Sequence, residues 1–279
     1  MPQIPTVMIR SIQFTKMQAA GNDYIYVYGQ DFQAEDASRV AADWCDRHKG
    51  IGADGIVLIN PSQIADFRMQ MFNADGSEGM MCGNAARCIG RYLYSRGYAG
   101  GDIALETASG VKELHVNSYE DQIVGISVNM GAPSFSNTSQ FLPEKEQDIP
   151  EDFRGHFVSM GNPHYVIFVK DVSRVRLEKI GKQLEHASCF PAAANIEFAQ
   201  FIDDNLIRMR VWERGSGITL ACGTGACATA VAAISYFGRG RNQTILMDGG
   251  LVQVEWQGGD VILTGDAEEV YSGKIGIEQ

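Results

Sequence analysis

Short runs of hydrophobic residues, many of them alternating with polar ones, recur along the whole chain. Runs of this length and periodicity predict β-strands. Turn-forming stretches such as Asp203-Asp204-Asn205 and Asp248-Gly249-Gly250 separate some of them. The expected strands cover residues 12–17, 24–28, 56–60, 67–72, 103–107, 112–117, 125–130, 165–169, 196–201, 206–212, 244–247, 251–256 and 260–263. The pattern therefore predicts a mostly β protein.

A few segments have helical patterns instead. The expected helices cover residues 37–45, 84–95, 177–184 and 225–236. Asp36 is the expected N-cap of the first helix. The last helix is rich in Ala, Gly and Thr, and such small residues predict a helix packed in the middle of a curled sheet.

The chain also contains an internal repeat. Met69, followed after a fixed spacing by Cys82-Gly83, recurs as Met209 followed at the same spacing by Cys222-Gly223, and the offset is 222 − 82 = 140. The same offset relates Gly21-Asn22 to Gly161-Asn162, Phe72-Asn73 to Trp212-Glu213, and Asp54-Gly55-Ile56 to Ala194-Asn195-Ile196. Because this offset is about half of the 279 residues, it predicts two similar, β-rich halves related by a pseudo-twofold axis. We expect the first half to span residues 1–124, with residues 266–279 packing back on it, and the second to span 125–265.

The composition excludes several classes of function. The 23 Lys and Arg residues are outnumbered by 34 Asp and Glu residues, so the formal net charge is −11 and argues against nucleic acid or an anionic membrane as partner. No run of about 20 strongly apolar residues predicts a membrane span. The first residues have no secretory-signal pattern, so we expect a cytoplasmic protein whose six cysteines stay reduced. No pair is spaced C-x-x-C, and we expect no metal site.

The repeated cysteines carry the most specific chemical signal. Cys82 and Cys222 each stand at the expected N-terminus of a helix, where unpaired N–H groups lower a thiol pKa and also bind carboxylates. A pseudo-twofold would turn both helix starts toward one cleft and set two thiols on opposite faces of one anionic substrate. Two such acid–base groups suit inversion of a stereocentre, because one removes a proton and the other returns one. No cofactor is needed if the helix starts stabilise the enolate-like carboxylate.

The other candidate residues have simpler alternative explanations. Cysteine is a common small core residue, and this is our interpretation of the four cysteines outside the repeat, Cys45, Cys88, Cys189 and Cys227. The asparagines at 22, 73, 162 and 195 can be turn formers. His164 can be a buried, hydrogen-bonded histidine, and Glu213 can be an ordinary surface carboxylate.

Six motifs together resemble the diaminopimelate epimerase family. They are Gly21-Asn22-Asp23-Tyr24, Phe72-Asn73-Ala74-Asp75-Gly76-Ser77-Glu78, Met81-Cys82-Gly83-Asn84-Ala85-Ala86-Arg87-Cys88, Ser159-Met160-Gly161-Asn162-Pro163-His164, Val211-Trp212-Glu213-Arg214-Gly215 and Ala221-Cys222-Gly223-Thr224-Gly225-Ala226-Cys227. The motifs appear in family order over nearly the whole chain. The resemblance implies an α/β (α+β) fold of two pseudo-symmetric halves, each a curled, mostly antiparallel sheet wrapped around a central helix.

The resemblance also implies an activity and a set of site residues. The activity is interconversion of L,L- and meso-2,6-diaminopimelate, in lysine and peptidoglycan precursor synthesis, without pyridoxal phosphate or metal and in a homodimer. Cys82 and Cys222 match the acid–base pair, His164 and the Glu213 side chain match groups that tune the thiols, and Tyr271 matches a dimer-forming tyrosine. The implied substrate-binding residues are Asn22, Asn73, Gly83, Asn84, Asn162, Asn195, Glu213 (through its carbonyl), Arg214, Gly223 and Thr224. Arg214 suits the distal carboxylate, since a guanidinium fork binds carboxylate bidentately.

Four positions depart from the family pattern and bear on substrate geometry. These are Gln18, Gly55, Ala193 and Ile218. A related amino-acid racemase could share the thiols and differ in distal recognition, which makes Arg214 the discriminating residue. A third possibility from another class is a redox protein in which Cys82 and Cys222 form a disulfide switch.

Overall fold

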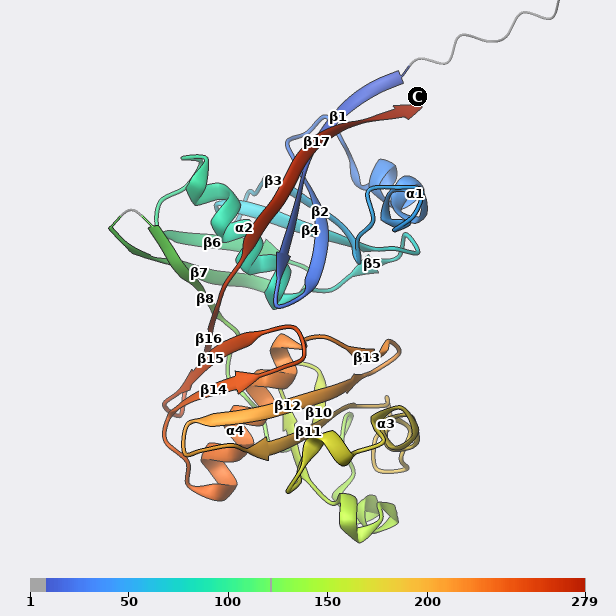
Figure 1. Ribbon diagram of the computed structural model, residues 1–279, viewed down its shortest axis with the longest axis vertical. Coiled ribbons are helices and arrows are strands. Elements are labelled where there is room, and N and C mark those ends of the chain that lie inside the picture. Colours follow the sequence, from blue (N-terminus) through green and yellow to red (C-terminus); the bar gives the residue numbers. More distant parts are fainter. Residues whose placement is uncertain (1–8, 121, 279) are drawn as a thin grey trace, which may run out of the picture. The chain divides into compact units, whose positions relative to one another are not determined.

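The chain folds into two compact units (Figure 1). The computed structural model describes residues 9–120 and 122–278. Among these, unit 1 contains the residues up to Ala19, Asp23–His115 and the segment from Ala267 onward. Unit 2 contains Ala20–Asn22 and Val116–Asp266. No helix in the described part of the chain is long and apolar enough to cross a membrane.

Unit 1 is built on a mixed sheet with two helices. Its elements are β1 (Ile9–Ala19), β2 (Asn22–Tyr28), α1 (Ala34–Cys45), β3 (Gly55–Pro61), β4 (Phe67–Asn73), β5 (Glu78–Gly79), α2 (Gly83–Ser95), β6 (Asp102–Thr107), β17 (Glu268–Glu278) and the first half of β7 (Gly110–Tyr119). β1 and β17 form a long antiparallel ribbon that contacts α2. The core contains the stacked rings of Phe32 and Trp44, at a centroid distance of 5.0 Å, between α1 and the sheet.

Unit 2 repeats this plan with longer connections. Its strands are the rest of β7, β8 (Gln122–Asn129), β9 (His156–Ser159), β10 (Pro163–Phe168), β11 (Asn195–Phe201), β12 (Leu206–Glu213), β13 (Gly217–Thr219), β14 (Asn242–Leu246), β15 (Leu251–Trp256) and β16 (Val261–Gly265). Its helices are α3 (Leu177–Glu185), α4 (Gly223–Phe237) and the 3-10 turns η1 (Pro143–Asp148), η2 (Glu151–Phe153) and η3 (Val172–Arg174).

The strand registers confirm the internal repeat. In unit 1, Tyr24 of β2 pairs in parallel with Gly55 of β3, and in unit 2 the equivalent residues of the repeat, His164 and Asn195, form the same parallel pair. Three further pairs also recur at this offset. The pair Ile56–Phe72 recurs as Ile196–Trp212, the pair Phe72–Glu78 recurs as Trp212–Ile218, and the pair Phe67–Leu105 recurs as Ile207–Ile245. The pairing between strands is therefore duplicated residue by residue.

The helix that follows Cys222 lies in the middle of its unit, as its small residues predict. α4 contacts β9, β10, β11, β12, β14, β15 and β16, and every residue from Gly225 to Ala233 is buried. Alanine and glycine at these positions let the strands pack close to the helix backbone on all sides. The start of α4 is thereby fixed by the packing of the whole unit.

α3 holds the end of β12 that carries Glu213 and Arg214. Gly181 packs directly against the indole of Trp212, since a Cβ at Gly181 would lie 2.5 Å from the Trp212 Cβ. Glu185 of α3 accepts hydrogen bonds from Trp212 Nε1 over 2.8 Å and from the backbone N–H of Gly215 over 2.7 Å. The turn after β12 is therefore anchored on both sides of Arg214.

Most predicted helices and strands are present, but several begin or end at other residues than predicted. All four predicted helices are present, and three begin slightly earlier in the chain than predicted. Asp36 is not the N-cap of α1, because the helix starts after Gln33, and Asp36 instead accepts from the Gln33 backbone N–H over 3.4 Å. The strands β5, β9, β13 and β17 were not predicted. Of these, β17 is the longest and is mostly exposed, so its stability comes from pairing with β1.

Candidate active site

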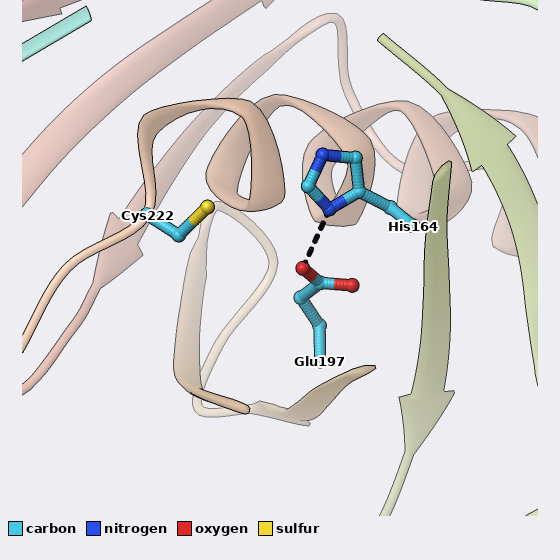
Figure 2. A group of neighbouring side chains, drawn as sticks. All are labelled: His164, Glu197 and Cys222. Atoms are coloured by element: carbon cyan, nitrogen blue, oxygen red, sulfur yellow. Dashed lines mark hydrogen bonds and ion pairs between the residues drawn. The ribbon is translucent and has the colours of Figure 1, made fainter. Parts of the chain in front are cut away.

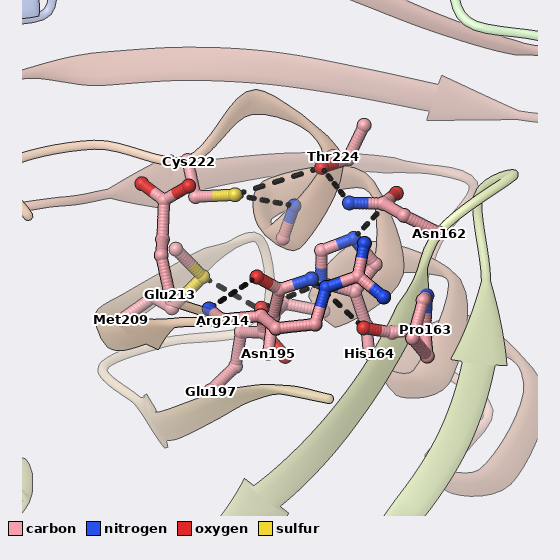
Figure 3. A network of polar contacts seen from close by, with 12 residues as sticks. Asn162, Pro163, His164, Asn195, Glu197, Met209, Glu213, Arg214, Cys222 and Thr224 are labelled. Atoms are coloured by element: carbon pink, nitrogen blue, oxygen red, sulfur yellow. Dashed lines mark hydrogen bonds and ion pairs between the residues drawn. The ribbon is translucent and has the colours of Figure 1, made fainter. Parts of the chain in front are cut away.

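Cys222 is the N-cap residue of α4 and is almost fully buried, with 6% of its surface exposed. Its extended backbone (φ −126°, ψ 110°) turns the side chain back over the first helical turn. The sulfur accepts a hydrogen bond from the backbone N–H of Gly225 over 3.4 Å and lies 3.5 Å from Thr224 Oγ1 (Figure 3). The predicted helix-start position of this thiol is confirmed.

The electrostatic surroundings of Cys222 differ from the prediction. Burial raises the pKa of the Cys222 thiol well above its usual value, and the carboxylates of Glu213 and Glu197 raise it further. The hydrogen bonds from Thr224 and Gly225 act in the opposite direction and do not compensate. The expected lowering of the pKa by the helix N-terminus is therefore wrong for Cys222, because two nearby carboxylates and burial outweigh the helix donors.

Glu213 is the acidic group nearest in sequence to this thiol. Figure 3 shows its carboxylate, at the end of β12, pointing toward the Cys222 sulfur. The hydroxyl of Thr219 donates a hydrogen bond to this carboxylate. Burial raises the pKa of Glu213, while the contacts with Thr219 and Cys222 oppose that rise. Its backbone carbonyl accepts from the Ser216 N–H over 3.1 Å.

His164 lies beside the same helix start and is completely buried. Its Nδ1 lies 2.7 Å from Glu197 Oε1, and both side chains have no exposed surface (Figure 2). Its Nε2 lies 3.0 Å from the Asn162 Oδ1, and the Asn162 amide donates to Thr224 Oγ1 over 3.4 Å. The structure thus connects His164, Asn162 and Thr224, three predicted site residues, into one network that ends at Cys222 (Figure 3).

Glu197 was not among the residues predicted from the sequence. A carboxylate inside the apolar run Asn195-Ile196-Glu197-Phe198-Ala199 of a buried strand is unusual, and this signal could have identified it. His164, Glu197 and Cys222 are also the one group among the described residues whose possible metal-binding atoms lie within 4.8 Å of one another. Because His164 Nδ1 and Glu197 Oε1 already bond each other, we interpret the group as a hydrogen-bonded pair beside a thiol.

Both ends of the Asn195 side-chain amide form hydrogen bonds with the protein backbone. Its Nδ2 donates to the Pro163 carbonyl over 2.8 Å, and its Oδ1 accepts from the Arg214 N–H over 2.9 Å. The Arg214 guanidinium is exposed and donates to the carbonyl of Ala192 over 3.2 Å. Asn195 is therefore placed to hold the two loops that carry Asn162 and Arg214.

Unit 1 contains the matching helix start. Cys82 is the N-cap residue of α2, with an extended backbone (φ −128°, ψ 120°), and is partly exposed. Gly83 and Asn84 follow it in the first, buried turn of the helix. Asn73 ends β4, and its Nδ2 donates to Ser77 Oγ over 2.9 Å. Gly223 takes the position equivalent to Gly83 in unit 2.

Asn22 belongs to unit 2 by its contacts, although most of β2 lies in unit 1. The turn before it packs tightly on the segment that leads to Cys222. A Cβ at Gly21 (φ +83°) would lie 3.0 Å from Leu220 Cδ1, and Gly249 donates its N–H to the Leu220 carbonyl over 2.8 Å. The structure therefore groups Asn22 with the Cys222 helix start rather than with Asn73 and Cys82.

The four residues that depart from the family pattern have different surroundings. Gln18 donates to Glu268 Oε2 over 2.9 Å across the β1–β17 ribbon. Gly55 admits no side chain, since a Cβ there would lie 2.2 Å from the Phe72 carbonyl oxygen. Ala193 adopts a positive φ of 58° in the turn before β11, and Ile218 is exposed on β13.

Comparison with solved structures identifies the fold class. A PhzF-family phenazine biosynthesis protein from Bacillus anthracis matches with a TM-score of 0.70 at 18% identity, over 95% of this chain and 99% of that one. A hydroxyproline epimerase from Agrobacterium vitis matches with a TM-score of 0.69 at 16% identity, over 97% and 94% of the two chains. The protein therefore has the mixed α/β fold of these proteins, and the predicted fold class is confirmed.

A family model and relatives of higher sequence identity show the family of this chain. The family model of diaminopimelate epimerase matches residues 14–136 and 156–270. Curated diaminopimelate epimerases from Phocaeicola vulgatus and Bacteroides thetaiotaomicron are 48% and 47% identical, each over 96% of this chain and 99% of the relative. One from Methanococcus maripaludis is 44% identical over 95% of this chain and all of the relative. The chain belongs to the diaminopimelate epimerase family.

Proposed function

We propose that the protein is an isomerase that interconverts L,L- and meso-2,6-diaminopimelate, a step of lysine and peptidoglycan precursor synthesis. Relatives that carry the name diaminopimelate epimerase match it over nearly their whole length at 43–48% identity. The observation that carries the mechanism is the cysteine at the start of the helix in each duplicated half, Cys82 and Cys222.

The reaction needs one base and one acid on opposite faces of a carbon atom. In each turnover one thiolate removes the α-proton, and the other residue, as a thiol, returns a proton to the opposite face. Cys82 and Cys222 exchange these roles in the reverse direction, so the protons balance without an external acid. This chemistry requires no pyridoxal phosphate and no metal. The raised pKa of the Cys222 thiol favours its neutral form, which is the form that the acid of the pair requires.

The substrate-binding groups follow from the two helix starts. The backbone N–H groups of Gly83 and Asn84, and of Gly223 and Thr224, belong to the first turns of α2 and α4, where the helix dipole favours the reacting carboxylate. Arg214, exposed just after the end of β12, suits the distal carboxylate. The Asn22, Asn73 and Asn162 side chains and the Glu213 carbonyl complete the polar contacts, while Asn195 holds the Arg214 loop.

Incubation of the reduced protein with L,L-diaminopimelate in deuterated water tests this function. We expect deuterium at one α-carbon together with inversion to the meso isomer. The absence of exchange at any enzyme concentration contradicts the proposal. Parallel reactions with and without reductant separate it from a redox switch, because an epimerase loses activity when Cys82 and Cys222 are oxidised, and a switch protein has no exchange activity in either state.

We further propose a cytoplasmic homodimer. Tyr271 lies on β17 with 43% of its surface exposed, and its hydroxyl donates to the Ile51 carbonyl over 3.1 Å. Its ring packs edge-on against Phe14 of β1 at a centroid distance of 5.9 Å. A dimer contact on this ribbon predicts that Tyr271→Ala shifts the mass measured by light scattering from dimer to monomer, and an unchanged mass contradicts it.

A further inference from the structure

Glu197 is a buried charge that the proposed mechanism leaves unexplained. It lies on β11 with no exposed surface, between His164 and the first turn of α4. Its Oε1 accepts from His164 Nδ1, whereas its Oε2 is buried without a hydrogen-bond partner in the part of the chain that the structure describes. A buried carboxylate with an unsatisfied oxygen destabilises a fold unless a positive charge lies beside it.

The hydrogen bonds around His164 indicate where that positive charge is. Nδ1 lies 2.7 Å from Glu197 Oε1, and a carboxylate in its ionised form only accepts hydrogen bonds. Nε2 faces the carbonyl oxygen of the Asn162 amide over 3.0 Å, which also only accepts. Both ring nitrogens must then donate, and a histidine donates from both nitrogens only as the imidazolium.

The donors and acceptors between His164 and Cys222 follow from the same hydrogen bonds. The Asn162 amide donates its N–H to Thr224 Oγ1 over 3.4 Å, because its oxygen is taken by His164. The Thr224 hydroxyl therefore has its own hydrogen available for the Cys222 sulfur, 3.5 Å away. A hydroxyl that donates to the sulfur stabilises the thiolate more than the thiol.

We propose that Glu197 is a positioning residue: it holds His164 protonated at both ring nitrogens, and through Asn162 it directs the Thr224 hydroxyl hydrogen toward the Cys222 sulfur. The functional part of this inference rests on the proposed role of Cys222 as an acid–base group. The charged or titratable groups that face His164 are Glu197 from β11, Glu213 from β12 and Cys222 from the start of α4.

Gly225 shows how closely the fold accommodates this carboxylate. A Cβ at this position would lie 2.6 Å from Glu197 Oε1 and 3.3 Å from the Cys222 sulfur. A glycine in the first turn of α4 therefore leaves room for Glu197 Oε1 directly beside the helix start. The motif Cys-Gly-Thr-Gly and the buried Glu197 are in this way two parts of one packing arrangement.

Nuclear magnetic resonance tests the proposal on the native protein. In the ¹⁵N-labelled enzyme at pH 7.5, long-range ¹H–¹⁵N correlations report the protonation of each of the five histidine rings. The His164 signals are assigned by their loss in His164→Gln. We expect both His164 nitrogens to carry protons. A single protonated nitrogen means either that the Asn162 amide has the reverse orientation or that Glu197 carries the proton. Either result overturns the proposal without any variant at position 197.

Glu197→Gln tests the role of the carboxylate. The variant keeps the size of the side chain, and we expect one His164 nitrogen to lose its proton, with kcat lowered about 10- to 100-fold and KM little changed. Glu185→Gln is the matched control, because Glu185 is another buried carboxylate of unit 2 and its hydrogen bonds come from the neutral N–H groups of Trp212 and Gly215. It should lower the melting temperature while leaving the His164 signals unchanged.

The His164 signals and the deuterium exchange into diaminopimelate together separate this proposal from the proposed function. Unchanged His164 signals in Glu197→Gln, or an equal change in Glu185→Gln, overturn the positioning role. If the native enzyme shows two protonated nitrogens but does not exchange deuterium into diaminopimelate, the proposed function fails while the assignment of the charge pair stands. A fall in kcat in Glu197→Gln without a change in the His164 signals also contradicts the proposal.

Discussion

The side chain of Asn195 holds the backbone of Arg214: its Oδ1 accepts the Arg214 N–H over 2.9 Å. At its other end Nδ2 donates to the Pro163 carbonyl over 2.8 Å, so one buried amide joins the start of β10, next to Asn162, to the loop that carries Arg214. A side chain whose amide is occupied by the backbone in this way fixes the position of the Arg214 backbone, and the same atoms are not available to a ligand.

Asn195→Ala should weaken both stability and substrate binding. The change leaves the Arg214 N–H and the Pro163 carbonyl without partners, and each such loss costs about 1–3 kcal/mol. We expect a lower melting temperature and a raised KM for diaminopimelate, measured by thermal unfolding and steady-state kinetics. Asn117→Ala is the control, since Asn117 donates to Ser127 Oγ over 2.9 Å within the same unit and is not part of the proposed site. A native KM in Asn195→Ala contradicts the inferred role.

The internal repeat made the centre of the fold predictable from the sequence. The two helix starts at Cys82 and Cys222, and the strands β3, β4, β11 and β12, follow from local patterns that occur twice. β17 was not predicted, because most of its residues are exposed and only its last part, with Ile275 and Ile277, faces the core. The strand is held by pairing with β1, which lies at the opposite end of the chain.

The chemistry of the site was only partly predictable. The position of Cys222 followed from the sequence, but the rise of its pKa did not, because that rise comes from burial and from the carboxylates that the fold brings beside it. Glu197 is separated from Cys222 in the sequence by the whole of β12 and β13, and a single acidic residue in a strand gives no sign of its neighbours. Only the pairing of β10 with β11 places it beside His164.

Each cysteine at a helix start should be essential. We expect Cys82→Ala and Cys222→Ala each to abolish epimerisation of diaminopimelate, because one face of the α-carbon then has no acid–base group. Cys45→Ala and Cys189→Ala are the controls, since both residues are buried core positions outside the repeat. The measurement is the rate of meso-isomer formation together with solvent deuterium uptake. Near-native racemisation by either helix-start variant would refute the two-thiol mechanism.

Alkylation should distinguish the six cysteines. Cys82 is partly exposed, whereas the other five are buried. Burial raises the pKa of both Cys45 and Cys189 to about 11, so at pH 8 only about one thiol in a thousand is ionised at either site. We expect the first iodoacetamide adduct on Cys82, identified by peptide mass spectrometry of the native protein. A first adduct on Cys45 or Cys189 would show that the core of its unit opens more readily than Cys82 reacts.

Asp23 should contribute to stability at neutral pH and lose that contribution in acid. Burial raises its pKa, but hydrogen bonds and charges from Arg47 and Lys16 outweigh this effect, so the pKa of Asp23 lies below its usual 3.8. A lowered pKa in the folded state stabilises the protein above the unfolded value, and this stabilisation disappears as the pH falls through the folded value. Asp23→Asn should therefore lower the free energy of unfolding by about 2 kcal/mol at pH 7.

The difference between native protein and Asp23→Asn should shrink below about pH 4, measured by urea unfolding at several pH values. Asp102→Asn is the control, because its ion pair with His115 is exposed and should contribute little at any pH. A constant difference across the pH range would mean that the asparagine disrupts packing and that the charge of Asp23 is not the cause.

The last prediction concerns the selection of substrate by Arg214. A substrate with an amino acid at each end must be held at the end that does not react, or the thiols would face the wrong carbon atom. In the proposed site the backbone N–H groups at the helix starts bind one carboxylate, and such groups do not distinguish between substrates. Arg214 is exposed just after the end of β12, and its backbone is fixed by Asn195. We therefore expect its planar guanidinium to bind the second carboxylate.

Arg214→Met should cost about 2–5 kcal/mol of transition-state binding, the scale for removing one partner of a buried charge pair. At 1.36 kcal/mol per factor of ten, this corresponds to a loss in kcat/KM between about 30-fold and several thousand-fold. Arg214→Lys keeps the charge but loses the planar fork, so it should fall between the native enzyme and the methionine variant. Arg210→Met provides the matched control, since Arg210 lies on β12 and pairs with Asp248 over 3.3 Å. The measurement is kcat/KM for diaminopimelate and for the monocarboxylates lysine and alanine. If Arg214→Met loses no more than Arg210→Met, or if the native enzyme converts a monocarboxylate equally well, Arg214 does not select the substrate.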